Sequence, residues 1–149
     1  MTIGEFCNRR VVVAPRGMTV LTGAKLMRQF HVGNVIVADE SEGGRVPVGI
    51  VTDRDIVLEV LAQDVDPSGL SLADIMSRDL LTVNEKQSVF EAVHSMCQRG
   101  VRRAPVVDDA GKLAGIVAID DLLELFADQL GELTKLIARE QKEETMARP

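Results

Sequence analysis

Gly49-Ile50-Val51-Thr52-Asp53-Arg54-Asp55 is followed, 66 positions later, by a second version of itself, Gly115-Ile116-Val117-Ala118-Ile119-Asp120-Asp121. Each version begins with β-branched residues, which are typical of a strand, and ends in polar residues, which are typical of a helix start. A repeated strand-to-helix junction indicates a repeated fold, so the flanking residues should also correspond.

The correspondence continues toward the amino terminus. The helical pattern of Val20–Met27 matches Val89–Met96 at an offset of 69 residues. The offset is 69 at this helix but 66 at the strand-to-helix junction, so the first repeat carries three extra residues between the two. They fall in Asp39–Arg45, a polar, Gly-rich turn where an insertion is tolerated.

Hydrophobic periodicity predicts the same elements in both copies. The first copy should contain an extended segment at Arg10–Ala14, a helix at Thr19–Phe30, strands at Val35–Ala38 and Val46–Val51, and a helix near Arg54–Gln63. The second should contain an extended segment at Leu80–Val83, a helix at Val89–Arg99, strands at Ala104–Val107 and Leu113–Val117, and a helix near Asp120–Leu130. Ser88 and Glu91 form a predicted capping box.

One β-α-β-β-α unit has too little core to stand alone, so two copies should bury their sheet faces against each other. We predict an α+β fold with repeat 1 at residues 1–66, repeat 2 at 67–130 and a helical tail at 131–149. Leu133, Leu136 and Ile137 follow helical spacing in that tail. Two interpretations stay open for it: a helix packed on its own module, or a contact to a second copy or an effector protein.

Composition excludes several classes of function. The net charge is −6, and Trp and Tyr are absent, so nucleic acid is a poor partner and a bound purine must lie between aliphatic side chains. No apolar run approaches the roughly 20 residues of a membrane span, and the first residues do not form a secretory signal. We expect a cytoplasmic protein with no membrane contact.

Catalytic and metal-binding patterns are missing. His31 and His94 have no neighbouring triad or metal-ligand spacing, so no catalytic residue and no metal ligand is predicted. Cys7 and Cys97 do not form a Cys-x-x-Cys pair. They are interpreted as reduced thiols, with a redox-dependent bridge as the alternative.

The doubled pattern, the Gly49–Asp55 junction and the connecting segment Ala73–Ser77 together resemble paired CBS domains, named after cystathionine β-synthase. The resemblance covers about residues 3–130. It implies two repeats related by pseudo-two-fold symmetry, with two clefts between them. Such clefts commonly hold AMP, ADP or ATP, and sometimes NAD or S-adenosylmethionine. The resemblance also implies a regulatory role and a homodimer.

Thr52 and Asp55 allow two interpretations. Their spacing is that of a helix cap, which alone would explain both residues. The same side chains could instead bind the sugar, with Thr52 contacting a hydroxyl and Asp55 taking both hydroxyls of a cis-diol. Arg54 and the helix start could then bind phosphate. The resemblance places Arg102 opposite Asp55, near a phosphate. The alternative is that Arg102 and Arg103 form a solvated pair at the entry of a strand. The resemblance also implies adenine contacts from Ile50, Leu81 and Pro105.

The second cleft departs from this pattern. Asp121 is kept, but Ala118 replaces the hydroxyl residue and acidic Asp120 stands where the first copy has Arg54. Asn34 is uncharged at the position matching Arg103, and the resemblance implies adenine contacts from Val12 and Ile36. A phosphate would be repelled here, so this cleft should be weaker, empty or selective for another ligand.

The favoured hypothesis is a non-catalytic regulatory module that binds an adenosine nucleotide and signals to an effector protein outside this chain. The alternative is a ligand-free structural or interaction module, with a redox form using Cys7 and Cys97. An enzyme acting on nucleotides is a third hypothesis, without support from any motif.

Overall fold

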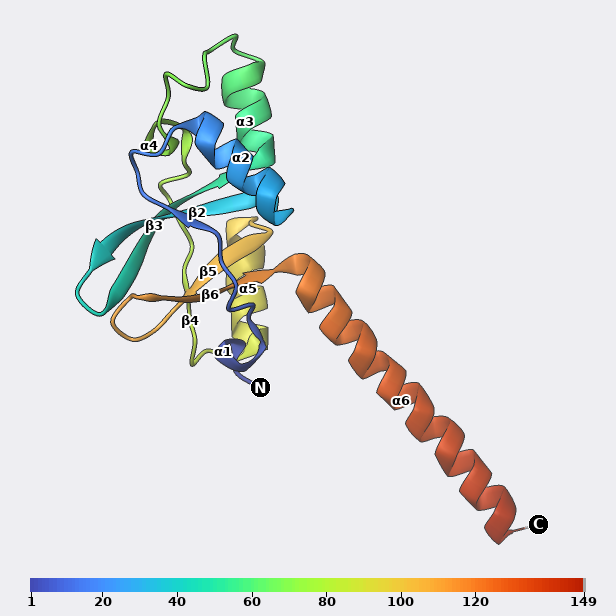
Figure 1. Cartoon of the computed structure of the whole chain (residues 1–149). Helices are drawn as coiled ribbons and strands as arrows, with labels where there is room; N and C mark the ends of the chain where they lie inside the picture. Colours follow the sequence, from blue (N-terminus) through green and yellow to red (C-terminus); the bar gives the residue numbers. More distant parts are fainter. Residues whose placement is uncertain (149) are drawn as a thin grey trace. The chain divides into compact units, whose positions relative to one another are not determined.

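The computed structural model describes residues 1–148 and divides into a unit at Met1–Val117 and a second unit that begins at Ala118 (Figure 1). The first holds two three-stranded sheets with helices, and the second is a long helix. The predicted α+β fold with two repeats and a C-terminal helix is confirmed.

The first repeat forms one sheet in the order β1-β2-β3. Its elements are β1 (Val13–Ala14), α2 (Val20–Phe30), β2 (Asn34–Ser41), β3 (Gly44–Thr52), α3 (Asp53–Ile56) and the π-helix η1 (Val57–Leu61). Strand β1 runs parallel to β2, and β2 runs antiparallel to β3. The parallel pairing needs a crossover, which α2 supplies.

The second repeat has the same order, β4-β5-β6. Its elements are β4 (Val83–Asn84), α5 (Val89–Arg99), β5 (Arg103–Val107), β6 (Leu113–Ala118) and α6 (Ile119–Ala147). The predicted capping box is confirmed: the Ser88 amide donates to Glu91 Oε2 over 2.8 Å, and the Glu91 amide donates to Ser88 Oγ over 3.1 Å. Gly100 ends α5 in the left-handed conformation that glycine favours.

Two short helices complete the repeats crosswise. Helix α4 (Leu72–Ile75) adds Leu72 to the core of the first repeat, where the Leu72 amide donates to the Met18 carbonyl over 2.8 Å. Helix α1 (Ile3–Phe6) instead joins the second repeat, where the Ile3 amide donates to the Gln87 carbonyl over 2.8 Å. Both Leu72 and Ile3 are fully buried.

The crosswise arrangement repeats in detail. A β carbon on Gly49 would lie 2.5 Å from Met76 Sδ, and one on Gly115 would lie 2.6 Å from Cys7 Sγ. Met76 follows α4 and Cys7 follows α1. The two contacts correspond under the sequence offsets of 66 and 69, so the two repeats are equivalent at the level of single contacts.

Element bounds differ from the expectation in several places. Strands β2 and β3 are longer than predicted, and the predicted helix near Arg54–Gln63 is α3 followed by the π-helix η1. Of the two extended segments, only Val13–Ala14 of the first and Val83 of the second are in strands.

Helix α6 runs unbroken over Ile119–Ala147, across residue 131, where the predicted tail begins. Gly131 lowers helix stability by about 1 kcal/mol but does not end a helix by itself. Ion pairs such as Arg139–Glu143 add local support.

Candidate functional site

The junction between β3 and α3 forms the capping box that the sequence predicts. The Thr52 amide donates to Asp55 Oδ2 over 2.8 Å, and the Asp55 amide donates to Thr52 Oγ1 over 3.2 Å. The Asp53 amide donates to the Gly33 carbonyl over 3.0 Å, which ties the junction to the residue before β2. One carboxylate oxygen of Asp55, Oδ1, has no hydrogen-bond partner within residues 1–148.

A cavity of about 420 Å³ opens at this junction. It is lined by Ile50, Thr52, Asp53, Arg54, Asp55, Ser77, Val101, Arg102 and Arg103. We call it the Asp55 cavity. Its wall comes from both repeats, because β3 and α3 belong to the first, while Val101 and Arg102 precede β5 of the second and Arg103 begins it.

The charges of the Asp55 cavity are of both signs. Arg54 and Arg103 have no ion-pair partner in the described part of the chain, while Asp53 and Asp55 supply two carboxylates. A β carbon on Gly33 would lie 3.2 Å from Asp53 Oδ2 and 3.5 Å from Arg103 Nη2. The Asp53 and Arg103 side chains therefore pack closely against Gly33. They occupy space that a side chain at position 33 would need.

Five predicted residues of the first cleft line this cavity: Ile50, Thr52, Arg54, Asp55 and Arg102. Leu81 and Pro105 do not. Pro105 is fully buried in β5, and Leu81 is half-buried before β4. Helix α3 passes directly into η1, so the two form one helical run from Asp53 to Leu61 behind the junction.

The sequence reasoning missed four lining residues: Asp53, Ser77, Val101 and Arg103. Ser77 had a usable signal, because it ends the connecting segment Ala73–Ser77. Its amide donates to the Ile50 carbonyl over 3.0 Å. Asn8, at the equivalent position of the other repeat, pairs with Ile116 in the same way.

The residues predicted for the second cleft lie in different places. Val12 lines a separate cavity of about 680 Å³, together with Arg10 and other residues from the N-terminal segment, α2 and β3. Ile36 is fully buried in β2, and Asn34 starts that strand. Asp121 lies in the first turn of α6, in the second unit.

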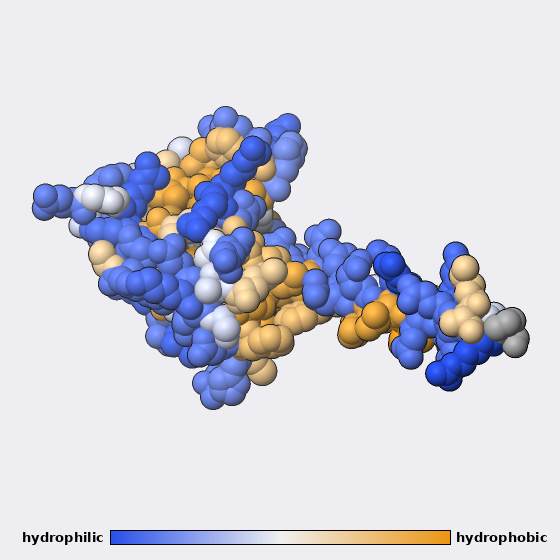
Figure 2. Space-filling view, turned by 90° about the horizontal axis from the view of Figure 1, so that it is seen from below, coloured by the Kyte–Doolittle hydropathy of each residue, from blue (hydrophilic) through white to orange (hydrophobic). Residues whose placement is uncertain are grey.

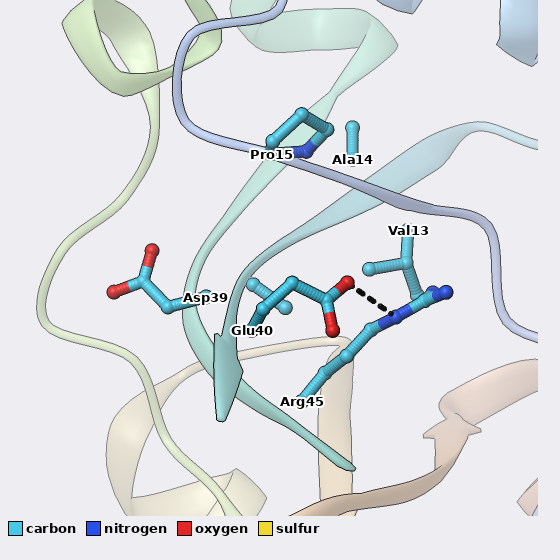
Figure 3. A pocket seen from close by; sticks show the side chains of 7 residues that line it. Val13, Ala14, Pro15, Asp39, Glu40 and Arg45 are labelled. Atoms are coloured by element: carbon cyan, nitrogen blue, oxygen red, sulfur yellow. Dashed lines mark ion pairs between the residues drawn. The ribbon is translucent and has the colours of Figure 1, made fainter. Parts of the chain in front are cut away.

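A further cavity of about 410 Å³ lies beside β1 and the β2–β3 turn (Figure 3). Its charged groups are already paired: Arg45 Nε lies 3.2 Å from Glu40 Oε1, and Asp39 accepts two hydrogen bonds from Arg16. The Arg16 guanidinium lowers the pKa of Asp39. Paired charges leave less for a ligand to bind, so the Asp55 cavity is the stronger candidate.

Two features are absent from residues 1–148. No helix there has the length and apolar character needed to cross a bilayer. No group of three or more His, Cys, Asp or Glu side chains is placed to hold a metal ion in that range.

Comparison with known proteins gives the family. The sequence profile of the CBS domain matches residues 3–62 and again 72–128. The chain belongs to the CBS-domain family. Its two repeats are thus a tandem CBS pair, as the sequence predicted.

Individual relatives agree with this. An uncharacterized protein of Methanopyrus kandleri is 38% identical over 125 residues, which are 84% of this chain and 62% of the relative. A CBS domain-containing protein of Bacillus subtilis is 35% identical over 121 residues, 81% of this chain and 82% of that one. This chain therefore spans less than two thirds of the first relative's length.

A solved structure shows what a similar CBS pair binds. The CBS pair of a protein crystallised with 5′-methylthioadenosine and S-adenosyl-L-methionine has a TM-score of 0.74 and 26% identity to this chain. The match covers 87% of this chain and 98% of that one. Adenosine compounds thus bind to a close structural neighbour.

Proposed function

We propose that this chain is a non-catalytic regulatory module that binds an adenosine nucleotide in the Asp55 cavity. The observation that carries the proposal is the meeting of Thr52 and Asp55 from one repeat with Arg102 and Arg103 from the other. The similar CBS pair in complex with two adenosine compounds supports it.

Three kinds of lining group would contact the three parts of the nucleotide. Asp55 keeps Oδ2 on the Thr52 amide and offers Oδ1 to the ribose hydroxyls. Ile50 and Val101 supply aliphatic surface for adenine, since the chain has no Trp or Tyr. The guanidinium groups of Arg54, Arg102 and Arg103 bind phosphate.

These charges favour particular ligands. The three guanidinium groups outnumber the two carboxylates of the cavity, so its net positive charge attracts the phosphates of AMP, ADP and ATP and repels the sulfonium cation of S-adenosylmethionine. NAD carries phosphate but is larger. We therefore rank AMP, ADP and ATP before NAD and S-adenosylmethionine.

We also propose that the module acts as a homodimer and signals to an effector protein. Exposed apolar side chains on η1 support a protein contact: Val57, Leu58 and Leu61 are 50%, 43% and 71% exposed. A ligand that contacts both repeats can shift their packing only by binding one arrangement more tightly than the other.

The test is a thermal-shift panel of AMP, ADP, ATP, NAD and S-adenosylmethionine on the wild type and two variants. A ligand at about 100 times its Kd adds about 2.7 kcal/mol of stability. At about 2–4 °C per kcal/mol this is several degrees. The Asp55→Ala variant should lose about 0.5–2 kcal/mol from the cap and also lose the ligand-induced shift.

Asp74→Ala is the matched control. Asp74 Oδ2 accepts from the Ser71 amide over 2.8 Å, the same contact that Asp55 makes with Thr52, but Asp74 does not line the cavity. It should cost similar stability and keep the ligand-induced shift. Equal ligand shifts in wild type and Asp55→Ala would refute the assigned site, and no shift with any compound would favour the ligand-free interaction module.

A further inference from the structure

Helix α6 carries an apolar stripe with the spacing of a helix-pairing surface. Leu123, Leu130 and Ile137 recur every seven residues, and Phe126 and Leu133 fall between them at the second apolar position of each heptad. A repeat of this kind places its members along one side of a helix. Figure 2 shows apolar side chains gathered along one side of α6 between hydrophilic ones.

The stripe is largely exposed. Leu123, Leu130, Leu133 and Ile137 are 61%, 64%, 56% and 56% exposed, and Leu136 beside them is 61% exposed. Each of these side chains is large and apolar, so their alignment on one helix marks a surface that needs a partner.

The positions beside the stripe are uncharged along its length. The flanking heptad positions hold Ala127, Gln129, Thr134 and Leu136. The charged residues of that stretch lie on the other faces of the helix. Small or uncharged side chains at these flanking positions let a second helix approach closely. They also do not require charged side chains at the flanking positions of that helix. This pattern fits a helix of the same kind.

Charge along the helix selects the orientation. The first part of α6, residues 120–132, contains five acidic residues and no basic one. The next ten residues contain Lys135, Arg139 and Lys142 against one acidic residue, Glu140. A parallel pair of identical helices would place acid on acid, whereas an antiparallel pair places the acidic part beside the basic part.

We propose that α6 pairs with α6 of a second copy of this chain in antiparallel orientation, with Leu130 facing Leu133 of the second copy. In this register the acidic residues 120–132 of each helix run alongside residues 131–143 of the other, which include Lys135, Arg139 and Lys142. The stripe covers only about two heptads, too few to join two chains alone. The inference therefore rests on the homodimer proposed above, which would hold the helices at high local concentration.

The experiment measures distances between spin labels in the full chain. Labels are placed one at a time by Glu124→Cys, Glu132→Cys or Ala138→Cys in a Cys97→Ser background, since Cys97 is exposed and Cys7 is buried. At about 1.5 Å per residue, antiparallel pairing separates labels at 124 by about 22 Å along the axis and labels at 138 by about 20 Å. Labels at 132 lie almost level.

Two substitutions complete the test. Leu133→Glu, within the stripe, should abolish the distance between labels at 132, whereas Ala138→Glu, on another face, should leave it unchanged. Similar short distances at all three positions would show parallel pairing and overturn the proposal. A light-scattering mass of a dimer without any distance between α6 labels would also overturn it, while leaving the homodimer intact. Nucleotide binding, measured in the same samples by thermal shift, reports separately on the Asp55 cavity.

Discussion

Asp55 shows how one residue can serve both structure and binding. The spacing of Thr52 and Asp55 left a helix cap and a sugar contact as alternatives, and the structure makes the first certain. The two roles do not exclude each other, because a carboxylate has two oxygens and the cap occupies one. Asp74 forms the same cap away from the cavity, so comparing the two variants separates the roles.

The two cysteines should differ strongly in reactivity. Burial raises the pKa of the Cys7 thiol, which lowers the thiolate fraction near pH 7, and Cys97 is exposed. Because the thiolate is the nucleophile, iodoacetamide should modify Cys97 first and Cys7 only on unfolding. Mass spectrometry over a time course checks this order.

The control for that experiment is Cys97→Ser, which should stay unmodified in the folded state. Rapid labelling of Cys7 in this variant would show that its environment opens. In the wild type, loss of both free thiols under mild oxidation, together with a disulfide-linked peptide that contains Cys7 and Cys97, would support the redox alternative instead.

At the scale of elements, the crosswise helices α1 and α4 are the feature that sequence order hides. Ile3 is buried against the second repeat, although it lies at the start of the first repeat's segment. Leu72 is buried in the first repeat, although it precedes the second. The repeats therefore hold each other's helices and should not fold as separate halves.

Truncating either anchor should loosen the repeat to which its helix is joined. Ile3→Ala and Leu72→Ala should each lower the free energy of unfolding by about 2–5 kcal/mol, the usual range for such buried residues. Hydrogen exchange should rise first in α5 and β4 for Ile3→Ala, and in α2 and β1 for Leu72→Ala. Faster exchange in α2 and β1 for Ile3→Ala and in α5 and β4 for Leu72→Ala, or an equal rise in all elements, would contradict the crosswise arrangement.

For the whole molecule, stability in acid should depend on two ion pairs, one in each repeat. Arg16 lowers the pKa of Asp39, and hydrogen bonds from Lys86 and Asn84 lower the pKa of Asp109. A carboxylate with a lowered folded-state pKa stabilises the fold above its ordinary pKa of about 3.9, and this stability is lost as the pH falls through the lower value.

Asp39→Asn and Asp109→Asn should therefore reduce the decline of Tm between about pH 4 and pH 2, with small effects at pH 7 because both pairs are exposed. Thermal unfolding across this pH range checks the expectation. Glu42→Gln serves as the control, since Glu42 has no ion pair within residues 1–148. Acid profiles of the two Asp variants that overlay the wild type would refute it.

The sequence alone determined the repeat, the order of strands and helices, and the capping boxes at Thr52 and Ser88. These features depend on residues close together in the chain, through side-chain periodicity and local hydrogen bonds. Even α1 and α4 had a visible signal, because Thr2–Glu5 and Ser71–Asp74 have the same spacing of polar and apolar residues at the offset of 69.

Only the tertiary structure decided which repeat each short helix joins and which residues line the Asp55 cavity. Asp53, Ser77, Val101 and Arg103 meet there from separate elements, and Pro105 turns into the core instead. Strand alternation limits a side chain to one of two faces, but the identity of each face depends on what packs against it. That packing involves residues far apart in the chain, so local pattern cannot specify it.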